Sequence, residues 1–231
     1  MKSKKEGLVK QGLIPDWLDN IFLGSVTPLI KFFCFTKINP NWITAFGFFQ
    51  NFIASIFIFY GHFIIGGILV GTAGIFDFID GKVATITQRV TKFGGIFDSI
   101  IYRYSDIVIY LAIILYYLKN DFDIPAFATL LALVGSVMTS YIKAIGESHG
   151  FKFRMGALRR QERVTLICAG LVFTFIHQPV VNFCHYLAGL FHIDIGVLPI
   201  MPLSLVIYFM AIFTNFTAVQ RFSALGKIAR E

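Results

Sequence analysis

Charged side chains are scarce in this chain. Only 14% of its 231 residues are Asp, Glu, Lys or Arg, and 56% are hydrophobic, whereas soluble globular domains carry about 25% charged residues. A soluble fold of this size would have to build its own surface from apolar side chains, which excludes that class. The composition therefore predicts a polytopic membrane protein.

Cysteine is also rare, and regular strand patterns are missing. The three cysteines, Cys34, Cys168 and Cys184, show no CxxC spacing, so we expect packing residues rather than disulfides. Apolar residues occur in long runs instead of alternating with polar ones, which favours helices over barrel strands. Cytoplasmic loops and contact with anionic membrane lipid explain the net charge of +7, so no nucleic-acid partner is expected.

Six windows of about 20 mostly apolar residues are long enough to span a bilayer. We predict the spans at 42–60, 62–79, 95–117, 124–147, 163–182 and 197–220. A more polar segment, residues 13–37, precedes them and is predicted to be an amphipathic helix in the membrane interface. The expected fold is therefore an all-α integral membrane protein, with an N-terminal tail and interfacial helix (1–40) followed by a six-helix membrane domain (41–231).

Lys and Arg are distributed unequally between the two sets of connections. The N-terminal tail, the connections after the second and fourth spans, and the C-terminal tail are basic, whereas the opposite connections contain only Lys119. Basic residues are retained on the cytoplasmic side. We therefore predict that both termini are cytoplasmic, in a cell or inner membrane. No cleavable signal is expected, because the first apolar stretch follows a polar opening and contains Asp16 and Asp19.

Four acidic residues lie in or beside the predicted spans, around the basic turn between the second and third. They are Asp77, Asp80, Asp98 and Asp106. An acidic residue within a span costs about 2.5 to 3.5 kcal/mol on insertion scales. Asp77 and Asp80 share a helix face, and Gly81 after them is expected to end the helix or let a backbone approach closely. Gly94 and Asp98 are four residues apart at the start of the third span.

The two helix ends can direct three carboxylates, those of Asp77, Asp80 and Asp98, at one point. Such oxygen ligands suit one or two hard divalent cations, Mg²⁺ or Mn²⁺, bound together with a phosphate. The alternative is a structural ion-pair network with neighbouring basic residues, namely Lys82, Arg89 and Lys92. The cost of placing carboxylates in a membrane favours metal binding.

The same stretch resembles the signature of the CDP-alcohol phosphatidyltransferases. That family's pattern is DxxDGxxAR, eight residues, then GxxxDxxxD, and it is matched by Asp77, Asp80, Gly81 and Ala84, and then by Gly94 and Asp98. Two positions differ from the pattern. Thr85 stands where the family has Arg, and Tyr102 stands where it has the last Asp, which in the family is the proposed base that takes the proton from the attacking alcohol.

The resemblance implies transfer of a phosphatidyl group from CDP-diacylglycerol, or a related CDP-lipid, to a polar alcohol with release of CMP. It assigns Mg²⁺ or Mn²⁺ to Asp77, Asp80 and Asp98. The segment with Asn41 and Thr44 is similar to the family's PNxxTxxG segment, which helps to hold the cytidine diphosphate. The implied CDP-lipid-binding residues are Asn41, Thr44, Asp80, Gly81, Ala84, Thr85 and Gly94. The base is then Asp98, a phosphate oxygen of the substrate, or Tyr102 itself.

Further along, the chain is similar to the phosphatidylinositol-phosphate synthase branch of the family. There, a lysine and two arginines bind the phosphate of inositol phosphate, which implies Lys143, Arg160 and Arg221, with Arg163 nearby. Ile145 and Gln161 depart from that branch. On sequence grounds alone, Lys143 is equally suited to a pair with Glu147 one turn away, and Arg159, Arg160 and Arg163 to topology determinants that contact anionic lipid.

The expected partners are a CDP-lipid, membrane lipid and an alcohol acceptor, for which inositol phosphate is the first choice. A homodimer is also expected, because members of the family commonly dimerise.

Two alternatives stay open. A catalytically impaired paralogue that still binds CDP-lipid would fit the loss of the last signature Asp, and a cation transporter would also place acids in spans, although nearer the midplane.

Overall fold

Helices account for nearly all of the residues that the computed structural model describes, which are 16–150, 160–190 and 201–228. The elements are α1 (Asp16–Phe35), α2 (Pro40–Phe59), α3 (Phe63–Ile86), α4 (Lys92–Lys119), α5 (Asp123–Ser148), α6 (Arg160–Val172), the 3₁₀ helix η1 (Phe173–Ile176), α7 (His177–Leu190) and α8 (Met201–Ile228). Arg159 and the lysines of the N-terminal tail lie outside the described residues. The all-helical prediction is confirmed over the described part of the chain.

Five of the predicted spans correspond to helices that are long and apolar enough to cross a membrane. These helices are α2, α3, α4, α5 and most of α8. Helix α3 ends at Ile86 instead of residue 79, and α8 ends at Ile228 instead of residue 220. The expectation that Gly81 ends α3 is therefore wrong. Ile79 and Val83 are fully buried against α1 and α2, and this packing extends the helix past the glycine.

The fifth predicted span, 163–182, is helical but not continuous. It is divided into α6, η1 and α7, and α6 is too short to cross a bilayer alone. Pro179, near the start of α7, has no N–H to donate to the carbonyl of Phe175, and its ring would clash with that carbonyl in an α-helix. The α-helix is therefore replaced by a 3₁₀ turn over the four residues before α7.

The amphipathic lead-in is also helical, as predicted. Helix α1 packs on α3, and Val26 and Ile30 join Ile43 of α2 and Ile79 and Val83 of α3 in a small buried cluster. Its place in the membrane interface stays a prediction.

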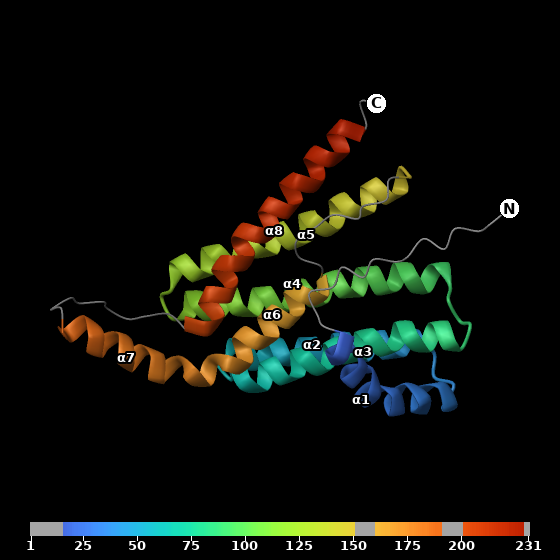
Figure 1. Cartoon of the computed structure of the whole chain (residues 1–231), viewed down its shortest axis with the longest axis horizontal. Helices are drawn as coiled ribbons and strands as arrows, with labels where there is room; N and C mark the ends of the chain where they lie inside the picture. Colours follow the sequence, from blue (N-terminus) through green and yellow to red (C-terminus); the bar gives the residue numbers. More distant parts are fainter. Residues whose placement is uncertain (1–15, 151–159, 191–200, 229–231) are drawn as a thin grey trace.

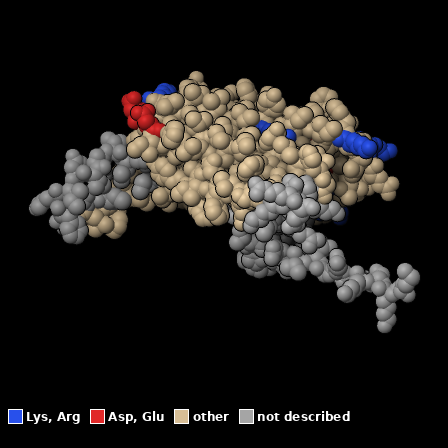
Figure 2. All heavy atoms as spheres, turned by 90° about the horizontal axis from the view of Figure 1, so that it is seen from above, with Lys and Arg blue, Asp and Glu red and all other residues tan. Residues whose placement is uncertain are grey.

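Figure 1 shows α2, α3 and α4 side by side, with α5 and α8 crossing each other next to them. Helix α6 lies against both α3 and α8 and so joins the two groups. The α3–α4 turn and the C-terminal ends of α5 and α8 lie toward the same end of the molecule. Uncharged side chains cover most of the face in Figure 2, and the charged ones occur in a few separate groups. This distribution suits helices surrounded by lipid.

Helices α5 and α8 approach each other closely along a seam of small and polar residues. The amide of Asn215 donates to the carbonyl of Leu131 at 2.8 Å, and the hydroxyl of Thr139 donates to the carbonyl of Thr214 at 3.1 Å. A Cβ atom on Gly135 would lie 2.8 Å from the backbone nitrogen of Asn215. Small residues and interhelical hydrogen bonds are the usual means of helix association in membranes.

We expect Gly135→Ala to lower the thermal unfolding temperature in detergent, because the added methyl meets the backbone of α8 and overpacking costs about 1 to 3 kcal/mol. Gly226→Ala is the matched control, since a Cβ there meets nothing within 4 Å and alanine favours helix. Equal unfolding temperatures for the two variants would contradict the close approach of α5 and α8.

Candidate active site

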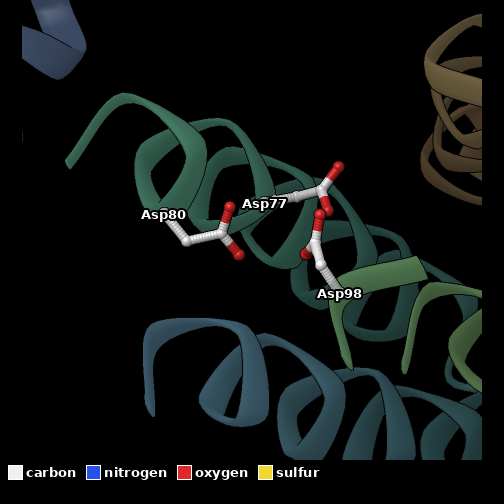
Figure 3. A group of neighbouring side chains, drawn as sticks. All are labelled: Asp77, Asp80 and Asp98. Carbon is white, nitrogen blue, oxygen red and sulfur yellow. The ribbon is translucent and has the colours of Figure 1, made fainter. Parts of the chain in front are cut away.

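Three aspartates converge where the end of α3 meets the start of α4. Asp77 and Asp80 come from α3 and Asp98 from α4, and one oxygen from each lies within 4.8 Å of the others. Figure 3 shows the Asp98 carboxylate next to that of Asp77, with the Asp80 carboxylate pointing toward them. The hydroxyl of Thr91 accepts a hydrogen bond from the backbone N–H of Gly94 at 2.9 Å, and this cap fixes the start of α4. The structure thus brings together the residues that the spacing selected.

Asp80 is the most constrained of the three. It is only 4% exposed, and its Oδ2 accepts a hydrogen bond from the Thr44 hydroxyl of α2 at 2.6 Å. The Tyr102 hydroxyl of α4 lies 3.1 Å from each carboxylate oxygen and donates to Asp80. Hydrogen bonds from two other helices therefore hold this carboxylate in place.

Arg160, the first residue of α6, supplies positive charge to the cluster. Its Nη1 contacts Asp77 Oδ2 at 2.7 Å, and its guanidinium carbon lies 3.9 Å from the centre of the Tyr102 ring. Its Nε lies 3.6 Å from Asp106, which also faces Arg163 at 3.9 Å. Asp106 is therefore the partner of two arginines and not a fourth member of the aspartate cluster.

The structural ion-pair network considered from the sequence would pair the aspartates with Lys82, Arg89 and Lys92 instead of Arg160. Lys82 lies over the ring of Phe78, and Arg89 donates to the backbone carbonyl of Lys37 at 2.8 Å. The latter bond joins the α3–α4 turn to the α1–α2 turn. Within the described part of the chain, the ion pair formed by the aspartate cluster is the one between Asp77 and Arg160.

Two carboxylate oxygens of the cluster have no hydrogen-bond partner within the described part of the chain. They are Asp77 Oδ1 and Asp98 Oδ1, and both are buried. Buried polar atoms are nearly always satisfied, and carboxylate oxygens are ligands that hard divalent cations prefer. These two atoms, from different helices, therefore fit a divalent cation.

The predicted nucleotide-binding residues lie at the start of α2, the end of α3 and the start of α4. Asn41 approaches Gly94, where a Cβ atom would lie 3.3 Å from its Oδ1, whereas a Cβ on Gly81 would meet nothing within 4 Å. Ala84 and Thr85 lie in the last turn of α3, and the Thr85 hydroxyl donates to the Gly81 carbonyl at 2.8 Å. A bulky side chain at Gly94 would therefore displace Asn41.

A cavity of about 470 Å³ opens beside the cluster, between α2, α3, α4 and α6. Asp77, Tyr102 and Arg160 line it, and small and apolar residues such as Gly71 and Val164 line it further along the helices. The cavity thus joins a charged region to an apolar one.

The remaining basic candidates surround one stretch of α5. Arg163 is 3% exposed and lies 3.5 Å from the Ser140 hydroxyl. Arg221 of α8 is 9% exposed and donates to the Thr139 carbonyl at 2.9 Å. Lys143 follows one turn along α5, is exposed, and pairs with Glu147 at 3.6 Å, which is the pairing that its sequence spacing allowed.

Two features of the site were missed from the sequence. One is the role of Asp106 as partner of Arg160 and Arg163, and the other is the stacking of Arg160 on Tyr102. A signal for the first was present, because Asp98, Tyr102 and Asp106 are spaced four apart and share one face of α4. The arginines themselves lie too far along the chain for local spacing to pair them.

The sequence profile described as CDP-alcohol phosphatidyltransferase matches residues 37–215. The chain therefore belongs to this family, and it is an integral membrane phosphatidyltransferase. It is 35% identical to a phosphatidylinositol phosphate synthase of Corynebacterium glutamicum over 159 residues, which cover 67% of this chain and 72% of that protein. It is 34% identical to an archaetidylinositol phosphate synthase of Pyrococcus horikoshii over 140 residues, which cover 60% and 72%.

Solved structures of a Mycobacterium tuberculosis phosphatidylinositol phosphate synthase share the fold. The form with CDP-DAG bound superposes with a TM-score of 0.70 at 23% identity, covering 86% of this chain and 92% of that one. The form in complex with manganese and citrate gives a TM-score of 0.68 at 24% identity, with 86% and 87% covered. At this identity the similarity supports the fold.

Thr44→Val should weaken Mn²⁺ binding by about tenfold or more, the usual effect of removing a group that orients a metal ligand, because Asp80 loses its shortest hydrogen bond. Thr129→Val is the matched control, since Thr129 is buried and its hydroxyl donates to the carbonyl of Pro125 in its own helix. Titration of each purified variant with Mn²⁺ measures the difference, and equal affinities would show that Thr44 does not orient Asp80.

Proposed function

We propose that this phosphatidyltransferase transfers the phosphatidyl group of CDP-diacylglycerol to a phosphorylated polyol, inositol phosphate, and releases CMP. The observation that carries the proposal is the convergence of Asp77, Asp80 and Asp98 at a cavity that also contains Arg160. Carboxylates that hold a divalent cation on a diphosphate, next to an arginine, form the arrangement that phosphoryl transfer requires. Phospholipid biosynthesis is the corresponding role.

Mg²⁺ or Mn²⁺ bound by the three aspartates would polarise the diphosphate and stabilise the CMP leaving group. The protein supplies the orientation of the ligands. Thr44 and Tyr102 hold Asp80, and Asp77 and Asp98 each keep a buried oxygen that has no hydrogen-bond partner among the described residues. Open space at Gly81 leaves room for the nucleotide near the backbone of α3.

The donor lipid fits the two kinds of surface in the cavity. Its charged headgroup would lie against Asp77 and Arg160, and its acyl chains would follow the apolar lining provided by α3 and α6. A related synthase has been solved with CDP-DAG bound, which supports a donor of this kind. The distribution of basic connections supports an active site that faces the cytoplasm, and a homodimer stays a prediction.

The acceptor proposal rests on the basic residues around α5. Arg163 and Arg221 contact Ser140 and Thr139, and Lys143 follows on the same helix. A phosphate placed among these cations would lie beside Arg160 and near the reacting diphosphate. Relatives named as phosphatidylinositol phosphate and archaetidylinositol phosphate synthases support an inositol phosphate acceptor.

Asp98 is the residue that we place as proton acceptor for the attacking hydroxyl. Its Oδ1 is the oxygen proposed to bind the cation, which leaves the other carboxylate oxygen to accept the proton. The Tyr102 hydroxyl, by contrast, already donates its proton to Asp80. Tyr102 is therefore better suited to positioning Asp80 than to accepting a proton.

CMP release by the purified protein tests the proposal directly. CDP-diacylglycerol and Mn²⁺ are supplied with inositol phosphate, glycerol phosphate, serine or free inositol in separate reactions. We expect CMP only with inositol phosphate, no CMP after EDTA treatment, and at least a hundredfold lower rate for Asp98→Asn, in line with the usual contribution of a general base. Binding of CDP-lipid without CMP release with any acceptor would contradict the proposal and favour the impaired paralogue.

Asp106→Asn should raise the KM for inositol phosphate severalfold, and by more than the KM for CDP-diacylglycerol, because Arg163 loses its carboxylate partner whereas Arg160 keeps its closer contact with Asp77. Asp123→Asn, at the start of α5, is the matched control and should leave both constants unchanged. Steady-state kinetics with each substrate varied in turn separate the two constants. An equal rise in both would contradict a role of Asp106 on the acceptor side.

A cation transporter, the other alternative, has less support. The carboxylates lie near the α3–α4 turn, and α3 and α4 are continuous helices at this point. Transporters place such residues at unwound helices near the midplane. The family match also assigns the chain to transferases.

A further inference from the structure

Tyr102 occupies the one signature position where the family pattern has a carboxylate and this chain does not. We infer that the aspartate cluster binds a single divalent cation, and that Tyr102 and Arg160 together take the place of a second one. The inference rests on the proposed function, because it concerns the cation assigned there. The sequence is compatible with either one or two bound cations, and we infer one.

The number of carboxylates is the first argument. Two-metal sites hold their ions about 3.5 to 4 Å apart, and two ions need more ligands than a single ion does. Here three carboxylates converge within 4.8 Å, which suffices to surround one ion. The fourth acidic residue of α4, Asp106, faces Arg160 and Arg163 instead.

The second argument is the position of the Tyr102 hydroxyl. It lies 3.1 Å from both oxygens of Asp80, and the Thr44 hydroxyl takes a further hydrogen bond on Oδ2. A second cation on this side of Asp80 would have to displace the phenol hydrogen. Tyr102 is half-buried, and the Arg160 guanidinium lies over its ring, 3.9 Å from the ring centre, which holds the phenol in place.

Charge balance is the third argument. The site contains four carboxylates, those of Asp77, Asp80, Asp98 and Asp106, and the guanidinium groups of Arg160 and Arg163 pair with two of them, Asp77 and Asp106. These groups leave two negative charges, which one divalent cation neutralises before substrate binds. A second cation would leave excess positive charge in a buried site, where unbalanced charge is costly. Arg160, paired with Asp77 at 2.7 Å, supplies the charge that a second cation would otherwise bring.

The number of bound cations tests this inference without a turnover assay. Calorimetric titration of the detergent-solubilised full chain with Mn²⁺ should give one ion per chain for the natural protein and two for Tyr102→Asp. Tyr102→Phe, which removes the hydroxyl without adding charge, should still bind one. Tyr104→Asp is the matched control, because Tyr104 is exposed on the same helix, and it should also bind one.

Two ions per natural chain, or one per Tyr102→Asp chain that unfolds cooperatively, would overturn the inference. Electron paramagnetic resonance of the natural chain with Mn²⁺ and CDP gives a second measurement that does not depend on the folding of a variant. The spectrum of an isolated ion is expected, and a spin-coupled pair would overturn the inference. A stoichiometry of one together with no CMP release would contradict the proposed reaction and leave the cation count standing.

Discussion

Buried carboxylates in membrane helices need positive charge close by, and this requirement organises the site. Asp77, Asp80, Asp98 and Asp106 all lie on α3 and α4, and two of them, Asp77 and Asp106, pair with Arg160 and Arg163 of α6. Removing one partner of a buried ion pair costs about 3 to 5 kcal/mol. The same contacts that allow the helices to pack therefore also place arginines beside the candidate cation site.

The packing of α6 serves this arrangement. A Cβ on Gly67 of α3 would lie 2.8 Å from the side chain of Val172, and one on Gly71 would lie 3.0 Å from the sulfur of Cys168. These glycines let α6 approach α3 closely, with Arg160 at the end nearest the aspartates. Helix α6 also packs on α8, which carries Arg221, so one short helix links the proposed cation site to the proposed acceptor site.

Local spacing predicted much of this protein, and long-range packing determined the rest. Length and hydropathy were sufficient for five spans, and the spacing of Asp77, Asp80 and Asp98 was sufficient for their convergence, because these depend on neighbouring residues. The continuation of α3 past Gly81 depends on burial of Val83 against α1 and α2. The Arg160–Asp77 pair joins residues 83 positions apart, and no local pattern determines such a contact.

The account depends most on the claim that the three aspartates form a cation site and not only an ion-pair network with Arg160. Anomalous diffraction from crystals grown with Mn²⁺ and CDP tests this claim directly. A manganese peak in contact with Asp77, Asp80 and Asp98 is predicted, with Asp77 Oδ1 and Asp98 Oδ1 among the ligands. Bound CDP with no manganese at these residues, and Asp77 paired only with Arg160, would contradict the account.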